Sequence, residues 1–222
     1  MSKQSLSSLI LFISFLFFFN SHAQDSQPLN CNSYELDGNK VIFGCDNEAK
    51  LSLKFLNSRN IKFWFSPDGS FKRNNESFAV INEDFDANYE ITVNESASNF
   101  EVFTGDLRIM VQKAPLKVQI FDKYQRLIMG DLDEAYVTEG SQVETRKVLR
   151  DDEQFFGLGE KAGPLNRRGR SYKMWNSDKP CYSDTEDPLY KSIPFFLSTY
   201  NYGIFLDNTY KTQFDFGDKN ED

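Results

Sequence analysis

The sequence predicts an all-β fold, a large antiparallel β-sandwich, and three observations carry that prediction. Apolar and polar residues alternate at period two through residues 34–149, with turn residues every eight to twelve positions. After the first 23 residues, no segment of ten or more residues has the 3.6-residue period of an amphipathic helix, which disfavours a βαβ fold. The 22 Phe, 10 Tyr and 2 Trp of the 222 residues are enough to fill the space between two sheets.

The expected strands start with a tight hairpin. Residues 34–36 and 41–45 alternate on either side of Asp37-Gly38-Asn39, a sequence that favours a short hairpin turn. The same alternation predicts further strands at residues 51–55, 61–65, 91–93, 100–103, 107–111, 116–120 and 143–149.

Residues 155–192 differ in character from the preceding strands. Glycines and prolines recur there among aromatic residues, a mixture too apolar for a solvated linker and too broken for regular strands. We expect an ordered long loop region that faces substrate, because ordered long loops are usually functional. Strand alternation resumes at residues 193–197 and 203–206.

The first residues have the features of a secretory signal peptide. A polar start with Lys3 precedes an apolar run over residues 9–19, and Ser21 and Ala23 are the small residues of a cleavage site. The run is about half the length of a membrane-spanning helix. We therefore expect a cleaved signal peptide at residues 1–23, an exported domain at residues 24–222, periplasmic or extracellular, and no membrane contact after cleavage.

Charge and histidine content exclude several kinds of chemistry. Without residues 1–23 the chain has 24 basic and 33 acidic residues, a net charge of −9, so nucleic acid is not an expected partner. A structural or ion-paired role is expected for the cluster Arg167, Arg168 and Arg170. His22, the only histidine, lies in the predicted signal peptide, which removes imidazole-based nucleophile activation and most zinc sites. No cofactor and no metal site are expected.

Three cysteines leave two interpretations open. Cys31 and Cys45 are close enough in sequence to form a disulfide, with Cys181 left over, and three unpaired thiols are the alternative.

Five sequence blocks in a fixed order carry a resemblance to a known family. They are Phe155-Phe156-Gly157-Leu158-Gly159-Glu160-Lys161, Arg167-Arg168-Gly169, Trp175-Asn176-Ser177-Asp178, Asp187-Pro188-Leu189-Tyr190-Lys191-Ser192-Ile193-Pro194-Phe195-Phe196 and Tyr202-Gly203-Ile204-Phe205-Leu206-Asp207-Asn208. In this order they resemble glycoside hydrolase family 31, which contains α-glucosidases and α-xylosidases. The resemblance implies a galactose-mutarotase-like β-sandwich, followed in complete members by a catalytic (β/α)8 barrel.

The same resemblance implies a division of chemistry within such an enzyme. Retaining hydrolysis of an α-glycosidic bond needs two carboxylates about 5 to 5.5 Å apart, and in this family both lie on the barrel. Neither barrel motif occurs in this chain, so no catalytic residue is predicted and the chain alone is expected to be inactive. The carboxylates Asp184, Glu186 and Asp187 are expected to be solvated loop charges, not an acid/base pair.

Two residues are candidate substrate-binding residues. In the family, a loop of the N-terminal domain lends an aspartate to the sugar, and Asp178 is the matching position. Trp175 offers an apolar ring face to a pyranose. The alternatives are a loop-capping role for Asp178 and, favoured for Trp175, a buried packing role.

Three functions compete at this point. The first is the N-terminal portion of an exported α-glycosidase, with an α-linked oligosaccharide and the catalytic barrel of the same enzyme as partners. The second is a stand-alone carbohydrate-binding or assembly module without catalysis. The third is an exported β-sandwich without sugar contact.

Overall fold

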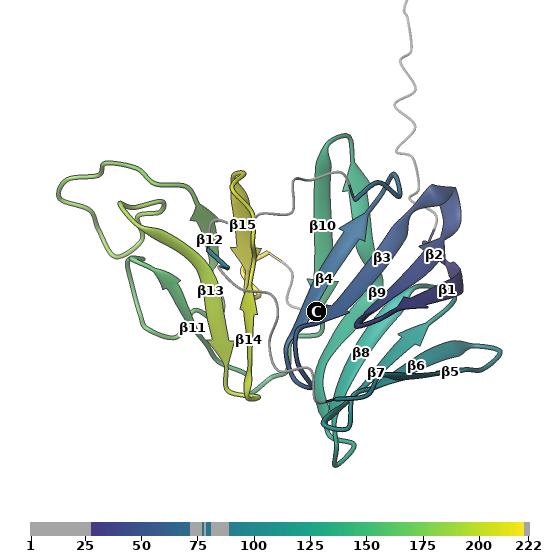
Figure 1. Ribbon diagram of the computed structural model, residues 1–222. Helices are drawn as coiled ribbons and strands as arrows, with labels where there is room; N and C mark the ends of the chain where they lie inside the picture. The colour runs from purple at the N-terminus through teal and green to yellow at the C-terminus, as the bar shows by residue number, and fades with distance from the viewer. Residues whose placement is uncertain (1–27, 72–76, 78, 81–88, 220–222) are drawn as a thin grey trace, which may run out of the picture.

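The computed structural model describes residues 28–71, 77, 79, 80 and 89–219, and within these ranges the fold is all-β. This confirms the predicted fold class. The predicted signal peptide at residues 1–23 lies outside the described residues. No helix long and apolar enough to cross a membrane occurs in the described part of the chain. Figure 1 shows the strands in two groups that stand side by side, β1 to β10 and β11 to β15.

The first sheet of the larger group is a four-stranded antiparallel meander in the order β1-β2-β3-β4. Its strands are β1 (Cys31–Asp37), β2 (Lys40–Cys45), β3 (Lys50–Phe55) and β4 (Ile61–Ser66), with a 3₁₀ turn, η1 (Asp46–Glu48), between β2 and β3. The predicted hairpin is confirmed, because Asp37 pairs with Lys40 across a two-residue turn. Gly38 has a φ of +58° there, a conformation that glycine adopts without steric cost.

The second sheet has six antiparallel strands in the order β10-β9-β8-β7-β6-β5. They are β5 (Thr92–Glu95), β6 (Asn99–Phe103), β7 (Leu107–Gln112), β8 (Lys117–Asp122), β9 (Leu127–Glu139) and β10 (Gln142–Lys147). Sequence patterning missed β9, the longest of them. Gly130 and Asp131 break its alternation, and Glu134 has a φ of +56° in its middle. Because the strand is irregular, its sequence does not have a clear two-residue period.

The two sheets enclose the main hydrophobic core. Alternate residues of β2 and β3 face alternate residues of β6, β7 and β8, and these inward side chains are fully or almost fully buried. The buried set is Val41, Phe43, Leu51, Leu53, Phe55, Phe100, Val102, Ile109, Val111, Leu116, Val118 and Ile120. Cys31 and Cys45 form a disulfide at the edge of this core and Cys181 is free, which settles the open cysteine pairing.

The smaller group has its own sheets and its own core. A three-stranded sheet has the order β11-β13-β14, and β12 pairs with β15. The strands are β11 (Phe155–Gly159), β12 (Ser171–Met174), β13 (Ser192–Ser198), β14 (Tyr202–Phe205) and β15 (Thr212–Asp215). Their core consists of Phe155, Leu158, Tyr172, Met174, Phe196 and Phe216.

Two strands in this group correct the expectation that residues 155–192 lack regular strands. The sequence pattern did not predict β11, because two of its five residues are glycines. A side chain at Gly157 would meet the Phe195 carbonyl oxygen at 2.4 Å, so the close approach of β13 requires glycine there. What remains without regular structure is the loop between β12 and β13, residues 175–191.

The segment between β10 and β11 joins the two groups. The Arg150 guanidinium donates hydrogen bonds to the carbonyl oxygens of Ile128 and Leu127 on β9, at 3.0 and 2.9 Å. Three residues later, Glu153 is buried and accepts hydrogen bonds from the hydroxyls of Ser198 on β13 and Tyr202 on β14. Burial of the Tyr202 hydroxyl, and then its hydrogen bond to Glu153, raise the pKa of Tyr202.

Candidate functional site

The loop over residues 175–191, the site loop below, is held at its base by a buried ion pair. The Lys161 side chain is fully buried, and its Nζ donates to the Asp187 carboxylate at 2.8 Å and to the Lys173 carbonyl oxygen on β12 at 2.6 Å. The second Asp187 oxygen accepts from the Lys173 backbone N–H at 2.6 Å. One carboxylate therefore fastens the site loop to β12 and to the β11–β12 connection.

This arrangement corrects one expectation about the acidic cluster. Asp187 is not a solvated charge, because a buried ammonium requires a partner and Asp187 is that partner. Asp184 is exposed as expected, and Glu186 forms a half-exposed ion pair with Lys179 at 3.1 Å. Among the described residues, no group of three or more His, Cys, Asp or Glu side chains is placed to hold a metal ion.

Main-chain contacts and one apolar anchor complete the base of the site loop. The Ser177 N–H donates to the Leu189 carbonyl oxygen at 2.8 Å, which brings the two ends of the loop together. Leu189 is fully buried beneath it. The site loop therefore has the features of a compact Ω-type loop: its two ends meet, and one of its own side chains anchors it.

The basic cluster has the structural role that the sequence predicted. Arg167 is buried and donates to the carbonyl oxygens of Gly157 and Pro164 at 3.2 and 2.8 Å. Arg168 donates to the carbonyl oxygens of Arg150 and Glu153. Arg170 donates to the carbonyl oxygen of Asp184 in the site loop at 3.1 Å.

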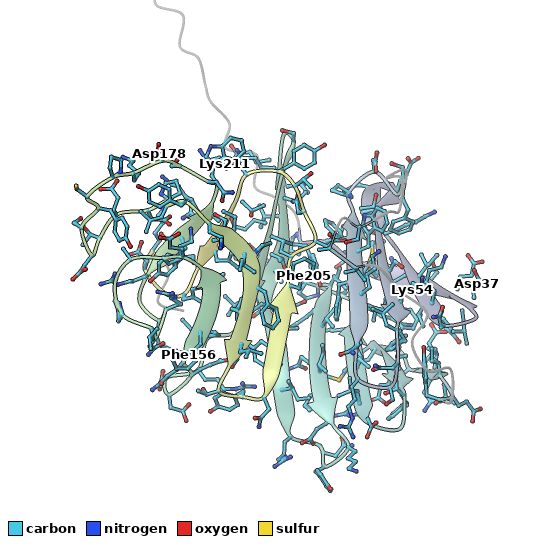
Figure 2. The ribbon with its side chains drawn as sticks, turned by 60° about the vertical axis from the view of Figure 1, so that its left-hand side comes forward. Asp37, Lys54, Phe156, Asp178, Phe205 and Lys211 are labelled. Atoms are coloured by element: carbon cyan, nitrogen blue, oxygen red, sulfur yellow. A yellow bond between two sulfur atoms is a disulfide. The ribbon has the colours of Figure 1, made fainter. Side chains whose placement is uncertain are left out.

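Asp178 lies exposed on the site loop, and Figure 2 shows it at the opposite end of the smaller group from Phe156. Its carboxylate lies near the Tyr190 hydroxyl on the same loop. Partial burial of that hydroxyl, and then the Asp178 charge, raise the pKa of Tyr190. The carboxylate is therefore open to solvent, as a ligand contact requires.

Trp175 does not have the packing role that was favoured for it. Its side chain is 53% exposed, because β12 alternates inward and outward and Met174, not Trp175, takes the last inward position. Trp175 instead lines an open hollow of about 350 Å³. Asp178 is not among the residues that line it, so the two predicted sugar contacts occupy different places on the smaller group.

The three-stranded sheet carries an apolar surface on the side away from its core. On β13, Phe196 and Ser198 point inward. The residues that alternate with them, Ile193, Phe195 and Leu197, point outward. Phe156 pairs with Leu197, and Phe195 with Phe205, so the outward side chains share one face. The outer apolar face, as we call it, consists of Phe156, Ile193, Phe195, Leu197 and Phe205, each 38–52% exposed. Continuous apolar surface of this kind typically marks an interaction site.

Three residues that matter in this region were not predicted from sequence. Lys161 follows a glycine-rich strand and gives no local sign that it will be buried. Ser192 and Tyr210 line the hollow beside Trp175. The alternation within Tyr172-Lys173-Met174-Trp175 is the one signal that predicts an outward Trp175.

Comparison with known proteins identifies the domain. A family model described as "Glycosyl hydrolase 31 N-terminal galactose mutarotase-like domain" matches residues 50–215. Alpha-glucosidase 2 of Bacillus thermoamyloliquefaciens is 33% identical over 193 residues, 84% of this chain and 24% of that protein.

Solved structures agree with this match. The Flavobacterium johnsoniae GH31 dextranase, in a complex with isomaltotriose, is 56% identical with a TM-score of 0.84, over 89% of this chain and 24% of that one. The cycloalternan-forming enzyme of Listeria monocytogenes, at 24% identity and a TM-score of 0.73, has the same fold. The chain spans about a quarter of the length of the first two of these relatives.

The Lys161 ion pair generates a stability prediction. Lys161→Met leaves the Asp187 carboxylate partly buried without its partner, and we expect it to lower the free energy of unfolding by about 3 to 5 kcal/mol. Urea denaturation followed by near-UV circular dichroism measures the change. Lys179→Met is the matched control on the same loop, because its ion pair is half exposed and is worth at most about 1 kcal/mol. Equal losses for the two variants would show that the buried pair does not hold the loop.

Proposed function

The chain belongs to glycosyl hydrolase family 31, and on that premise we propose that it is the N-terminal β-sandwich portion of an exported, retaining α-glycosidase. In this proposal the chain supports a catalytic barrel and presents the site loop to the substrate. The two catalytic carboxylates belong to that barrel, so residues 24–222 alone are inactive. Export is proposed from the features of residues 1–23.

The observation that carries the proposal is the fixed position of the site loop. A loop of 17 residues without regular structure is costly to order, yet Lys161, Asp187 and Leu189 hold it at its base while Asp178 stays exposed. A carboxylate held in this way accepts hydrogen bonds from two adjacent sugar hydroxyls. Rigid support of a binding residue is what substrate positioning demands.

The proposed substrate is an α-linked oligosaccharide of glucose. Support comes from the 56% identity to a dextranase whose structure contains isomaltotriose, and from the α-glucosidase among the relatives. Isomaltotriose is therefore the appropriate probe.

The proposed supporting role rests on the outer apolar face. Side chains such as Phe195 and Leu197 are half exposed on a sheet whose other side is already covered by a core. Burial of such side chains stabilises a contact by about 25 cal/mol for each Å² removed from water. We propose that the catalytic barrel covers this face in the natural-length protein, meaning the proposed enzyme that contains both this chain and the barrel.

Substitution of Asp178 tests the substrate contact. In the natural-length protein, Asp178→Ala is expected to lower kcat/KM for isomaltotriose by about 10- to 100-fold, the value of one or two hydrogen bonds to a charged group. Glucose release measures the change. Asp184→Ala, another exposed aspartate on the same loop, is the control and should stay within about twofold of the unsubstituted protein. Unchanged kcat/KM for Asp178→Ala would refute the proposed contact.

Substitution of the outer apolar face tests the supporting role. In an isolated 24–222 chain, Leu197→Ser is expected to raise the soluble yield, because it removes exposed apolar surface. In the natural-length protein the same change should lower the thermal unfolding midpoint, because it weakens the contact with the barrel. Phe196→Ser, one residue away on the buried side, should lower soluble yield and stability in both proteins. If Leu197→Ser improved both the soluble yield of the isolated chain and the unfolding midpoint of the natural-length protein, or lowered both, docking through this face would be contradicted.

A further inference from the structure

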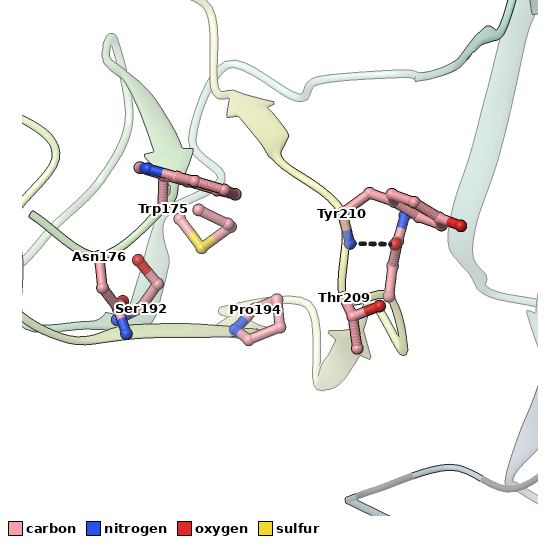
Figure 3. Close-up of a pocket in the computed structure, with 8 residues that line it drawn as sticks. Trp175, Asn176, Ser192, Pro194, Thr209 and Tyr210 are labelled. Carbon is pink, nitrogen blue, oxygen red and sulfur yellow. Dashed lines mark hydrogen bonds between the residues drawn. The ribbon is translucent and has the colours of Figure 1, made fainter.

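The hollow beside Trp175 has two aromatic walls. Trp175 follows β12 and Tyr210 precedes β15, and Figure 3 shows the two rings on opposite sides of the hollow with Pro194 of β13 between and below them. Tyr210 is 79% exposed and Trp175 53% exposed, so neither ring is committed to a core. The full lining is Met174, Trp175, Asn176, Ser192, Pro194, Asn208, Thr209 and Tyr210.

The lining has no charged side chain. A phosphate, a carboxylate or a metal ion would find no counter-charge there, and burial of an unpaired charge is costly. Amides and hydroxyls alternate with aromatic and aliphatic surface, which matches a neutral molecule with polar edges and an apolar face. A pyranose ring has this character, and about 350 Å³ is at the small end of the range for ligand sites.

The polar groups of the hollow are partly fixed and partly unsatisfied. Asn176 accepts the Ser192 backbone N–H at 2.9 Å, and Asn208 accepts the Tyr210 backbone N–H at 2.7 Å. Because each amide oxygen is held by the main chain, each amide nitrogen has a defined direction as a donor. The Ser192 hydroxyl is buried and has no hydrogen-bond partner. A buried hydroxyl without a partner is uncommon, and this one belongs to a residue that lines the hollow.

We propose that this hollow is a second saccharide site that binds one pyranose unit of a neutral oligosaccharide between Trp175 and Tyr210. The ring faces of the sugar lie against the aromatic side chains, and the Ser192 hydroxyl and the Asn176 amide hydrogen-bond to its hydroxyl groups. The site shares the saccharide class of the proposed function. It does not involve Asp178, and its failure is separable from a failure of the Asp178 contact.

Isomaltotriose binding to the natural-length protein tests the site. Measured by calorimetry in an Asp178→Ala background, Tyr210→Ala is expected to raise the dissociation constant at the hollow by about 3- to 10-fold. Tyr124→Ala is the matched control, because Tyr124 is 68% exposed in the turn between β8 and β9, outside the hollow. An unchanged dissociation constant for Tyr210→Ala, or the absence of binding beyond the catalytic site, overturns the proposal.

Two further variants distinguish binding from a structural role. Ser192→Ala removes a hydroxyl that has no partner, so stability should be unchanged or higher while saccharide binding weakens. Saccharide should also change the fluorescence of Trp175. Trp175→Phe should abolish this change and Trp64→Phe, on β4, should retain it. A saccharide response that is undiminished by Trp175→Phe places the sugar elsewhere and overturns the proposal.

Discussion

The buried ammonium of Lys161 is the constraint on which the geometry of the smaller group depends. A charge without solvent must be paired, and Lys161 meets this need with one carbonyl oxygen and the Asp187 carboxylate. Because these partners belong to β12 and to the site loop, the requirement of a single side chain fixes three segments together. Asp178, which is exposed, and Trp175, which lines the hollow, both belong to the site loop that this ion pair fastens to β12.

A second buried charge joins the smaller group to the sandwich. Glu153 binds hydroxyls of β13 and β14, while Arg150, three residues earlier, binds carbonyl oxygens of β9. Arg150 also lies over the Tyr200 ring, with 3.9 Å between the guanidinium carbon and the ring centroid. The connection between the two cores is thus polar and directional, which sets their mutual orientation more closely than apolar packing alone.

The sequence predicted what depends on neighbours in the chain and missed what depends on distant partners. The hairpin around Gly38 follows from local turn chemistry and alternation, and the five ordered blocks were enough to name the family. β9 was missed because Gly130 and Glu134 interrupt its period. The pairing of Lys161 with Asp187, 26 residues apart, has no local signature, so Asp187 appeared to be one more solvated carboxylate. The exposure of Trp175 follows from the alternation of β12, which places Met174 and not Trp175 on the inward side.

Strand β13 connects the surfaces proposed for function. Its outward residues, Phe195 and Leu197 among them, form the outer apolar face, whereas Ser192 and Pro194 contribute to the hollow. Because strand residues alternate between two sides, the outer apolar face and the hollow lie on opposite sides of one seven-residue strand. A shift of β13 by one residue would exchange the two sets. Pairing with both β11 and β14, and the glycine at position 157 that admits the close approach, fix this register and with it both surfaces.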